Sequence, residues 1–187
     1  MTEAFRHIPI KIYPLKINVK ELLVDWPEER MDKLFDISYL NPELLAFFKE
    51  RNIDIRSNFI LWNWYVNPTA NHLPLNNPHT DGDWFSEEQF IRKRPCGINW
   101  NFSEGTRVEF YSSEGSKPVF KYRSEHDFST IWLNCNKVIA VWDDAGPILF
   151  NPQIPHNIKG NPGVERRLSM TLRFNETYES LRDKLND

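Results

Sequence analysis

From residue 55 onward the chain is a succession of short segments rich in aromatic and β-branched residues, separated by turn-forming residues. This pattern is typical of strands, because branched and aromatic side chains pack well on a pleated sheet. The strands expected from it are 55–66, 97–102, 107–111, 118–122, 130–133, 137–142, 148–150 and 166–174. Many short strands in succession predict an antiparallel sandwich or barrel rather than a parallel sheet with alternating helices.

The last of these segments alternates cleanly between polar and apolar side chains. Its polar face carries Arg167, Ser169, Thr171 and Arg173, and its apolar face carries Leu168, Met170, Leu172 and Phe174. If the apolar face packs against helices, the polar face lines a solvated cavity. The alternative is an edge strand whose polar face is exposed to solvent.

Before residue 55 the pattern has the longer period of helices. Helices are expected to begin within 19–23 and to span 27–35, 43–50 and, near the C-terminus, 176–185. Pro27 and acidic residues form the first turn of the second helix, while Asn41 is the N-cap and Pro42 the first residue of the third. The elements predict a mainly β (α+β) fold, a double-stranded β-helix or jelly roll with the N-terminal helices packed on one face.

The composition is that of a soluble globular protein, with 40% hydrophobic and 26% charged residues in a chain of 187. We expect one domain, 1–187, with a helical shoulder over about 1–54 and a β core over about 55–175. The net charge of −3 argues against nucleic acid or an anionic membrane as a partner. Without a long apolar run or a secretory signal pattern, a cytoplasmic protein is expected. Cys96 and Cys135 are expected to be buried free thiols rather than a disulfide.

Three residues with metal-binding side chains stand in a suggestive order. His79 and Asp81 are separated by one residue, so in extended backbone both side chains lie on one face and can converge on an ion. His156 follows the proline-containing run 152–155, which holds the backbone extended before it. Two imidazoles and one carboxylate on one face of a metal leave three positions open, the arrangement of a non-haem Fe(II) centre.

Two other interpretations of these residues stay open. An HxD pair is frequent by chance, and a single histidine such as His156 is more often hydrogen-bonded in a core than bound to a metal. Zinc also accepts two histidines and a carboxylate, but the HExxH motif that commonly presents the general base of a zinc hydrolase is absent. Iron is favoured because zinc gives no reason for the arginine that follows.

That arginine is Arg167, on the polar face of 166–174. An arginine inside a β-barrel is costly unless it is paired, and an anionic ligand would pair it. The planar guanidinium binds a carboxylate through two parallel hydrogen bonds, and Ser169 can donate another. The sequence therefore predicts a carboxylate site beside the metal site.

The order of HxD, a distal histidine and RxS resembles that of the 2-oxoglutarate- and Fe(II)-dependent oxygenases, over residues 59–174. In that family HxD and the distal histidine bind Fe(II), and RxS binds the C5 carboxylate of 2-oxoglutarate. The resemblance implies His79, Asp81 and His156 as the metal-binding and catalytic residues, with Arg167 and Ser169 at the cosubstrate. It also implies O2 as the second cosubstrate and ascorbate as an accessory reductant.

Further residues enter as cosubstrate-binding candidates through the same resemblance. Tyr65 and Asn99 lie on strands where related enzymes often hydrogen-bond 2-oxoglutarate, and a structural role is the alternative for each. Arg173 matches a second arginine that the AlkB group of nucleic-acid demethylases uses at the cosubstrate. Arg166 competes with Arg167, because some relatives place their arginine at about that distance from the distal histidine.

The expected function is hydroxylation of an unidentified protein side chain or small molecule, while 2-oxoglutarate is converted to succinate and CO2. The alternative is a non-catalytic jelly-roll protein with a binding or structural role, since a fold alone does not fix function. A lesser alternative is a nucleic-acid demethylase of AlkB type, suggested by the HxDxD order of 79–83 and the basic run 92–94. The negative net charge argues against it, and such a run is more often a solvated loop.

Overall fold

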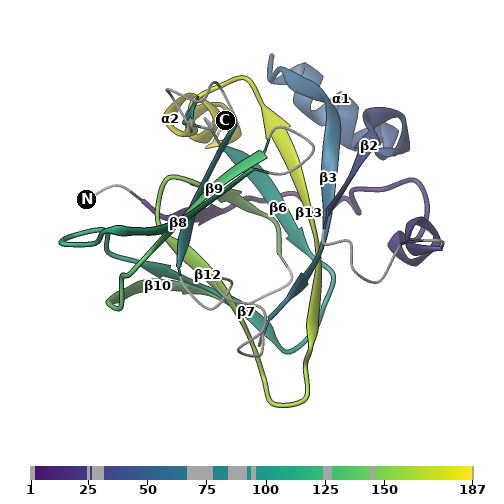
Figure 1. The fold of residues 1–187 in the computed structure, drawn as a ribbon. Coiled ribbons are helices and arrows are strands. Elements are labelled where there is room, and N and C mark those ends of the chain that lie inside the picture. The colour runs from purple at the N-terminus through teal and green to yellow at the C-terminus, as the bar shows by residue number, and fades with distance from the viewer. Residues whose placement is uncertain are drawn as a thin grey trace.

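Two antiparallel β-sheets make up most of the protein in a computed structural model (Figure 1). The residues that the structure describes are 3–24, 26, 32–66, 78–83, 92–93, 96–123, 128–143 and 146–186. The prediction of a mainly β protein with an antiparallel arrangement is therefore confirmed.

The first sheet, called the six-stranded sheet below, has β13 near its centre, paired with β3 on one side and β6 on the other. Its spatial order is β1 (Phe5–His7), β11 (Ile148–Phe150), β6 (Gly97–Asn101), β13 (Arg166–Phe174), β3 (Ile55–Tyr65) and β2 (Asp32–Asp36). The second, called the seven-stranded sheet, has the order β10 (Val138–Trp142), β7 (Thr106–Tyr111), β12 (His156–Gly160), β4 (His79–Asp83), β9 (Phe128–Leu133) and β8 (Pro118–Arg123), with β5 (Arg92–Lys93) paired to β4.

The helices of the described chain are short. They are the α-helices α1 (Pro42–Glu50) and α2 (Tyr178–Asn186) and the 3-10 helices η1 (Val19–Leu23) and η2 (Ile37–Tyr39). The predicted start of α1 is confirmed, because the Asn41 side chain accepts a hydrogen bond of 3.0 Å from the Glu43 backbone N–H and Pro42 occupies the first turn. None of these helices is long and apolar enough to cross a membrane.

The main hydrophobic core lies between the helices and the outer face of the six-stranded sheet. The apolar residues of β13 enter it together with residues of both α-helices: Met170, Leu172, Phe174, Leu44, Phe48, Leu181 and Leu185. The rings of Phe48 and Phe174 meet edge to face, with centroids 5.4 Å apart. The expectation that the apolar face of β13 packs on the N-terminal helices is confirmed, and α2 joins them from the other end of the chain.

A smaller core lies between the two sheets. It joins residues of β11 to residues of β7 and β10, and its buried members are Ala4, Val108, Phe110, Trp142, Ile148 and Phe150. Because these side chains come from both layers, they fix the inner face of one sheet against that of the other. The polar face of β13 also points into the space between the layers, where no comparable apolar cluster of described residues fills it.

The helix predicted over 27–35 is wrong over its second half. Residues 32–36 form β2, which pairs with β3 at the edge of the six-stranded sheet, and 27–31 lie outside the described residues. The ring of Phe35 stacks on that of Phe59 at 5.6 Å, so pairing with a neighbouring strand overrides the helical signals of the proline and acids. The start of a helix at 19–23 is a 3-10 helix closed by a capping box between Asn18 and Glu21.

The two cysteines behave differently. Neither is in a disulfide; Cys96 is buried as predicted, whereas Cys135 is only half-buried. Burial raises the pKa of the Cys96 thiol to about 12, so this thiol is protonated at neutral pH and is a weak nucleophile.

The packing of α1 gives a first prediction. Phe48→Ala should lower the free energy of unfolding by about 3–5 kcal/mol, because a fully buried aromatic ring is removed and leaves a cavity beneath α1. Lys49→Gln, at the neighbouring exposed position, should change it by no more than about 0.5 kcal/mol. Urea unfolding measures both, and equal midpoints for the two variants would contradict the packing of α1 on β13.

Candidate metal and anion site

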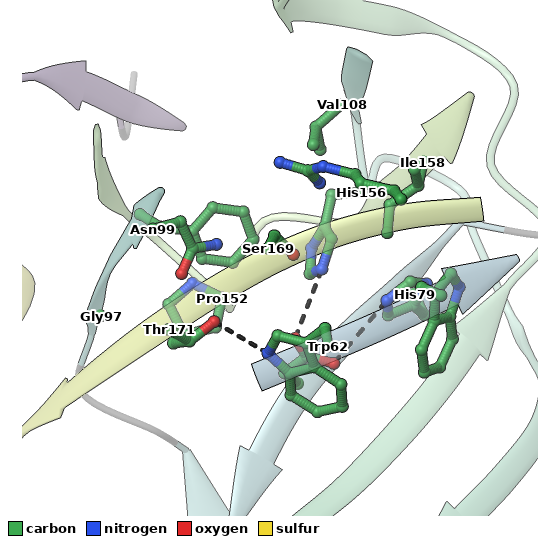
Figure 2. Close-up of a pocket in the computed structure, with 14 residues that line it drawn as sticks. Trp62, His79, Gly97, Asn99, Val108, Pro152, His156, Ile158, Ser169 and Thr171 are labelled. Carbon is green, nitrogen blue, oxygen red and sulfur yellow. Dashed lines mark hydrogen bonds and ion pairs between the residues drawn. The ribbon is translucent and has the colours of Figure 1, made fainter. Parts of the chain in front are cut away.

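A cavity between the sheets collects most of the polar residues that the sequence predicts for the site (Figure 2). From the six-stranded sheet it is lined by Trp62, Trp64, Gly97, Asn99, Phe150, Arg167, Ser169 and Thr171. From the seven-stranded sheet and the loop before β12 it is lined by His79, Asp81, Val108, Pro152, His156 and Ile158. The polar face of β13 therefore lines a cavity rather than facing solvent at a sheet edge.

His79, Asp81 and His156 come together in this cavity. Their nearest donor atoms all lie within 4.8 Å of one another, and each residue is at most 8% exposed. The Asp81 carboxylate stands between the imidazoles, with Oδ1 3.8 Å from Nε2 of His79 and Oδ2 3.4 Å from Nε2 of His156. The predicted convergence of the three side chains is what the structure shows.

Strand pairing explains this convergence. His79 is the first residue of β4 and His156 the first of β12, and the two are direct partners in the antiparallel ladder between those strands. Asp81, two residues further along β4, points to the same side of the sheet. Its backbone is held by the segment before β12: its N–H donates to Pro152 O at 2.9 Å, and its carbonyl accepts from Gln153 Nε2 at 2.7 Å.

Hydrogen bonds from neighbouring groups orient the ligand atoms of the cluster toward its centre. Nδ1 of His156 lies 3.0 Å from Ile154 O, and since a carbonyl only accepts, Nδ1 carries the proton and Nε2 is left as the ligand atom. Thr130 donates to Oδ1 of Asp81 at 3.4 Å. Partners of this kind fix the rotation of metal-binding side chains.

The donor set fits a divalent transition metal. Two imidazole nitrogens and one carboxylate oxygen are ligands that Fe(II) and zinc both accept, at bond lengths of about 2.0–2.2 Å. The donors are buried, close together and orientated, and a buried carboxylate between two imidazoles gains from a cation. The cluster could therefore hold a metal ion.

Arg167 lines the same cavity, and its positive charge is not matched by a carboxylate. It is 4% exposed, its Nε donates to Asn101 Oδ1 at 3.1 Å, and its guanidinium carbon lies 4.8 Å from the centre of the Trp142 ring. Among the described residues no carboxylate is within ion-pair distance of it. Burial lowers the pKa of Arg167 to about 9, which still leaves the group protonated at neutral pH. A buried cation of this kind is a site for an anion.

Neutral polar groups surround the cavity beside Arg167. The hydroxyl oxygen of Thr171 accepts a hydrogen bond of 2.9 Å from Trp62 Nε1 (Figure 2). The hydroxyl proton of Thr171 is therefore directed away from Trp62. Asn99 lines the cavity, and its buried Oδ1 has no hydrogen-bond partner within the ranges that the structure describes. Ser169 lies between Arg167 and Thr171 on the same face of β13. The cavity thus offers a cation and several hydrogen-bonding groups to one ligand.

The structure separates the predicted candidates. Arg166 does not line the cavity; it sits on the opposite face of β13 from Arg167. Arg173 is buried on the cavity side but is not among the lining residues, and it donates to the Asn58 side chain. The Tyr65 side chain lies outside the described residues, as do Arg94 and the side chains of the rest of the basic run 92–94.

Several lining residues were missed by sequence reasoning. Val108 and Ile158 close the cavity with apolar surface, and they look like ordinary core residues in the sequence. Gly97 is placed where a Cβ would meet Thr171 Cγ2 at 3.0 Å, so this strand approaches β13 too closely for a larger residue without a shift. Only the inward alternation of their strands could have placed these residues in the site.

A comparison of the sequence with models of protein families found no match, and a search of curated proteins found no similar sequence. The geometry of the cavity and the chemistry of its side chains are therefore the basis for proposing a function.

The cluster gives a second prediction. Co(II), or Fe(II) without O2, should raise the melting temperature of the protein. At a free metal concentration of one hundred times the dissociation constant, the gain in the free energy of unfolding is about 2.7 kcal/mol. His79→Ala should abolish this gain because it removes one of three ligand atoms, and Asp81→Asn should abolish it because a neutral amide oxygen replaces the anionic ligand.

Thr80→Ala is the matched control for these variants. Thr80 lies between the two donors on β4 but points to the other face, so its variant should keep the metal-dependent gain. Stabilisation of Asp81→Asn by Co(II) to the wild-type extent would show that the metal binds elsewhere.

Proposed function

We propose that the protein is an Fe(II)- and 2-oxoglutarate-dependent dioxygenase that hydroxylates a protein side chain or a small molecule. One observation carries the proposal: a buried cluster of two histidines and an aspartate shares a cavity with a buried arginine that no described carboxylate neutralises. A metal site alone fits many proteins. A metal site and a carboxylate site in one cavity fit a cosubstrate that has a carboxylate at each end.

The proposal includes a double-stranded β-helix as the fold. In that fold the chain passes repeatedly between two facing sheets. In support, β10 to β13 alternate between the seven-stranded and the six-stranded sheet, and so do β3 and β4 and, later, β6 and β7. The position of the cavity between the sheets agrees with this arrangement.

In this proposal His79, Asp81 and His156 hold Fe(II). When bound, the iron would supply the activation of O2 that hydroxylation requires, and three protein ligands would leave room at the metal for a keto acid. Arg167 and Ser169 hold the far carboxylate of 2-oxoglutarate through charge-assisted hydrogen bonds. Asn99 is a further candidate for the cosubstrate, because it lines the cavity and its amide N–H groups can donate to a carboxylate.

Part of the cavity wall is apolar and would limit the access of water to the reacting groups. Trp62 and Trp64 lie on one side, and Val108 and Ile158 close it with apolar side chains. A dry site strengthens the contact between Arg167 and a carboxylate and limits side reactions. In the overall reaction 2-oxoglutarate loses CO2 and takes up one oxygen atom of O2 to become succinate, and the other oxygen atom enters the substrate.

The arginine contact gives a third prediction. Arg167→Lys should weaken binding of 2-oxoglutarate to the Fe(II)-loaded protein by about tenfold or more, because an ammonium cannot reproduce the planar pair of hydrogen bonds. Arg166→Lys, one residue away on the other face, should bind as the wild type does. Calorimetric titration without O2 measures both affinities. The reverse result, with a loss only in Arg166→Lys, would move the carboxylate contact one residue back.

The fourth prediction concerns the reaction. With Fe(II), ascorbate and O2, the protein should convert 2-oxoglutarate slowly to succinate even without its substrate. Succinate is measured by chromatography, and Asp81→Asn should reduce it to the background rate because the metal is lost.

Background succinate from a wild-type protein that is iron-loaded and bound to 2-oxoglutarate, also with candidate substrates present, would contradict catalysis. That outcome would favour the non-catalytic binding protein.

A further inference from the structure

The polar partner of the buried Arg167 guanidinium is an amide. Asn101, on the neighbouring strand β6, accepts from Nε of Arg167 at 3.1 Å. Both residues are buried. Asparagine and aspartate have almost the same shape, and aspartate is the common partner of a buried arginine because it cancels the charge. Because the Asn101 amide is neutral, it leaves the positive charge of Arg167 for an anion in the cavity.

The orientation of the Asn101 amide is fixed by a local network. Its Nδ2 donates to Ser103 O at 2.9 Å and to Thr106 Oγ1 at 3.2 Å, and its Oδ1 also accepts from the Ser103 backbone N–H at 3.3 Å. Rotating the amide by half a turn would place N–H groups against N–H donors. The oxygen is thereby held toward Arg167 without any contribution from a ligand.

This contact leaves a defined part of the guanidinium for a ligand. A guanidinium can bind a carboxylate in parallel along the edge formed by Nε and one Nη, or along the edge formed by Nη1 and Nη2. Asn101 occupies the first edge, and the Trp142 ring lies against the guanidinium at 4.8 Å. Among the side chains that the structure describes, none hydrogen-bonds to the second edge.

We propose that Asn101 is a positioning residue for Arg167, which leaves the Nη1–Nη2 edge and the whole positive charge to a carboxylate of the ligand. Asn101 thereby makes the cavity selective for a keto acid with a second, distal carboxylate. The inference rests on the proposed function in taking that ligand to be 2-oxoglutarate. The positioning of Arg167 by Asn101 does not depend on the identity of the ligand.

The first test uses Asn101→Asp, which keeps the shape and the acceptor for Nε but supplies a negative charge. The Fe(II)-loaded protein is titrated without O2 with 2-oxoglutarate and with 2-oxopentanoate, which has a methyl group in place of the distal carboxylate. Affinity for 2-oxoglutarate should fall by about tenfold or more, the worth of one charge-assisted hydrogen bond. Affinity for 2-oxopentanoate should stay within about twofold, since this ligand has no group for Arg167.

Asn134→Asp is the matched control. Asn134 is exposed and accepts a hydrogen bond from the Lys117 backbone N–H, and it does not line the cavity. This variant makes the same change in net charge and should leave both affinities unchanged. An equal loss for both keto acids in Asn101→Asp would show a purely structural role, and no loss for either would show no role; each result overturns the proposal.

The second test needs no ligand. Asn101→Asp is compared in the wild-type protein and in an Arg167→Met background by thermal unfolding. A new buried carboxylate is unpaired only in the second background, so its cost in melting temperature should be greater there by about 3 °C or more. The same shift in both backgrounds would overturn the proposal. If wild-type protein binds neither keto acid, the proposed function has failed, and this comparison still decides whether Asn101 acts on Arg167.

Discussion

Strand β13 is packed on both faces, and each face depends on the other. Met170, Leu172 and Phe174 pack beneath the helices, and the opposite face carries Arg167 into the cavity. Removing a guanidinium from water without a carboxylate beside it costs free energy. The large apolar surface buried on the other face of the same strand offsets that cost. Arg167 can stay buried in the cavity because the helices hold β13 in the interior.

The two sheets contribute different chemistry to the cavity. The seven-stranded sheet brings the cluster of two histidines and an aspartate, and the six-stranded sheet brings Arg167 and its neighbours. The binding of a ligand that contacts both sheets therefore depends on the position of one sheet relative to the other. Trp142 links the two functions of the interface, because it belongs to the apolar cluster between the sheets and its ring lies against Arg167. The packing between the two sheets therefore also sets the position of the Arg167 charge.

Much of the fold could be predicted from the sequence, because most strands carry apolar side chains that report burial. Strands β4 and β12 were not predicted, since their inward positions hold His79, Asp81 and His156 instead of apolar residues. For the site the situation is reversed: the ordered motif predicted which residues converge. Asn101 was missed because its partner lies 66 residues away in the sequence, and no local pattern marks that contact.

The ladder between β4 and β12 contains a single residue pair, and that pair is His79 with His156. On either side of it the seven-stranded sheet consists of two well-paired groups of strands, β10, β7 and β12 on one side and β4, β9 and β8 on the other. A metal ion at these histidines would bridge the two groups where backbone pairing is thinnest. If the cluster holds a metal ion, occupancy of the site would therefore also strengthen the junction between these two groups of strands.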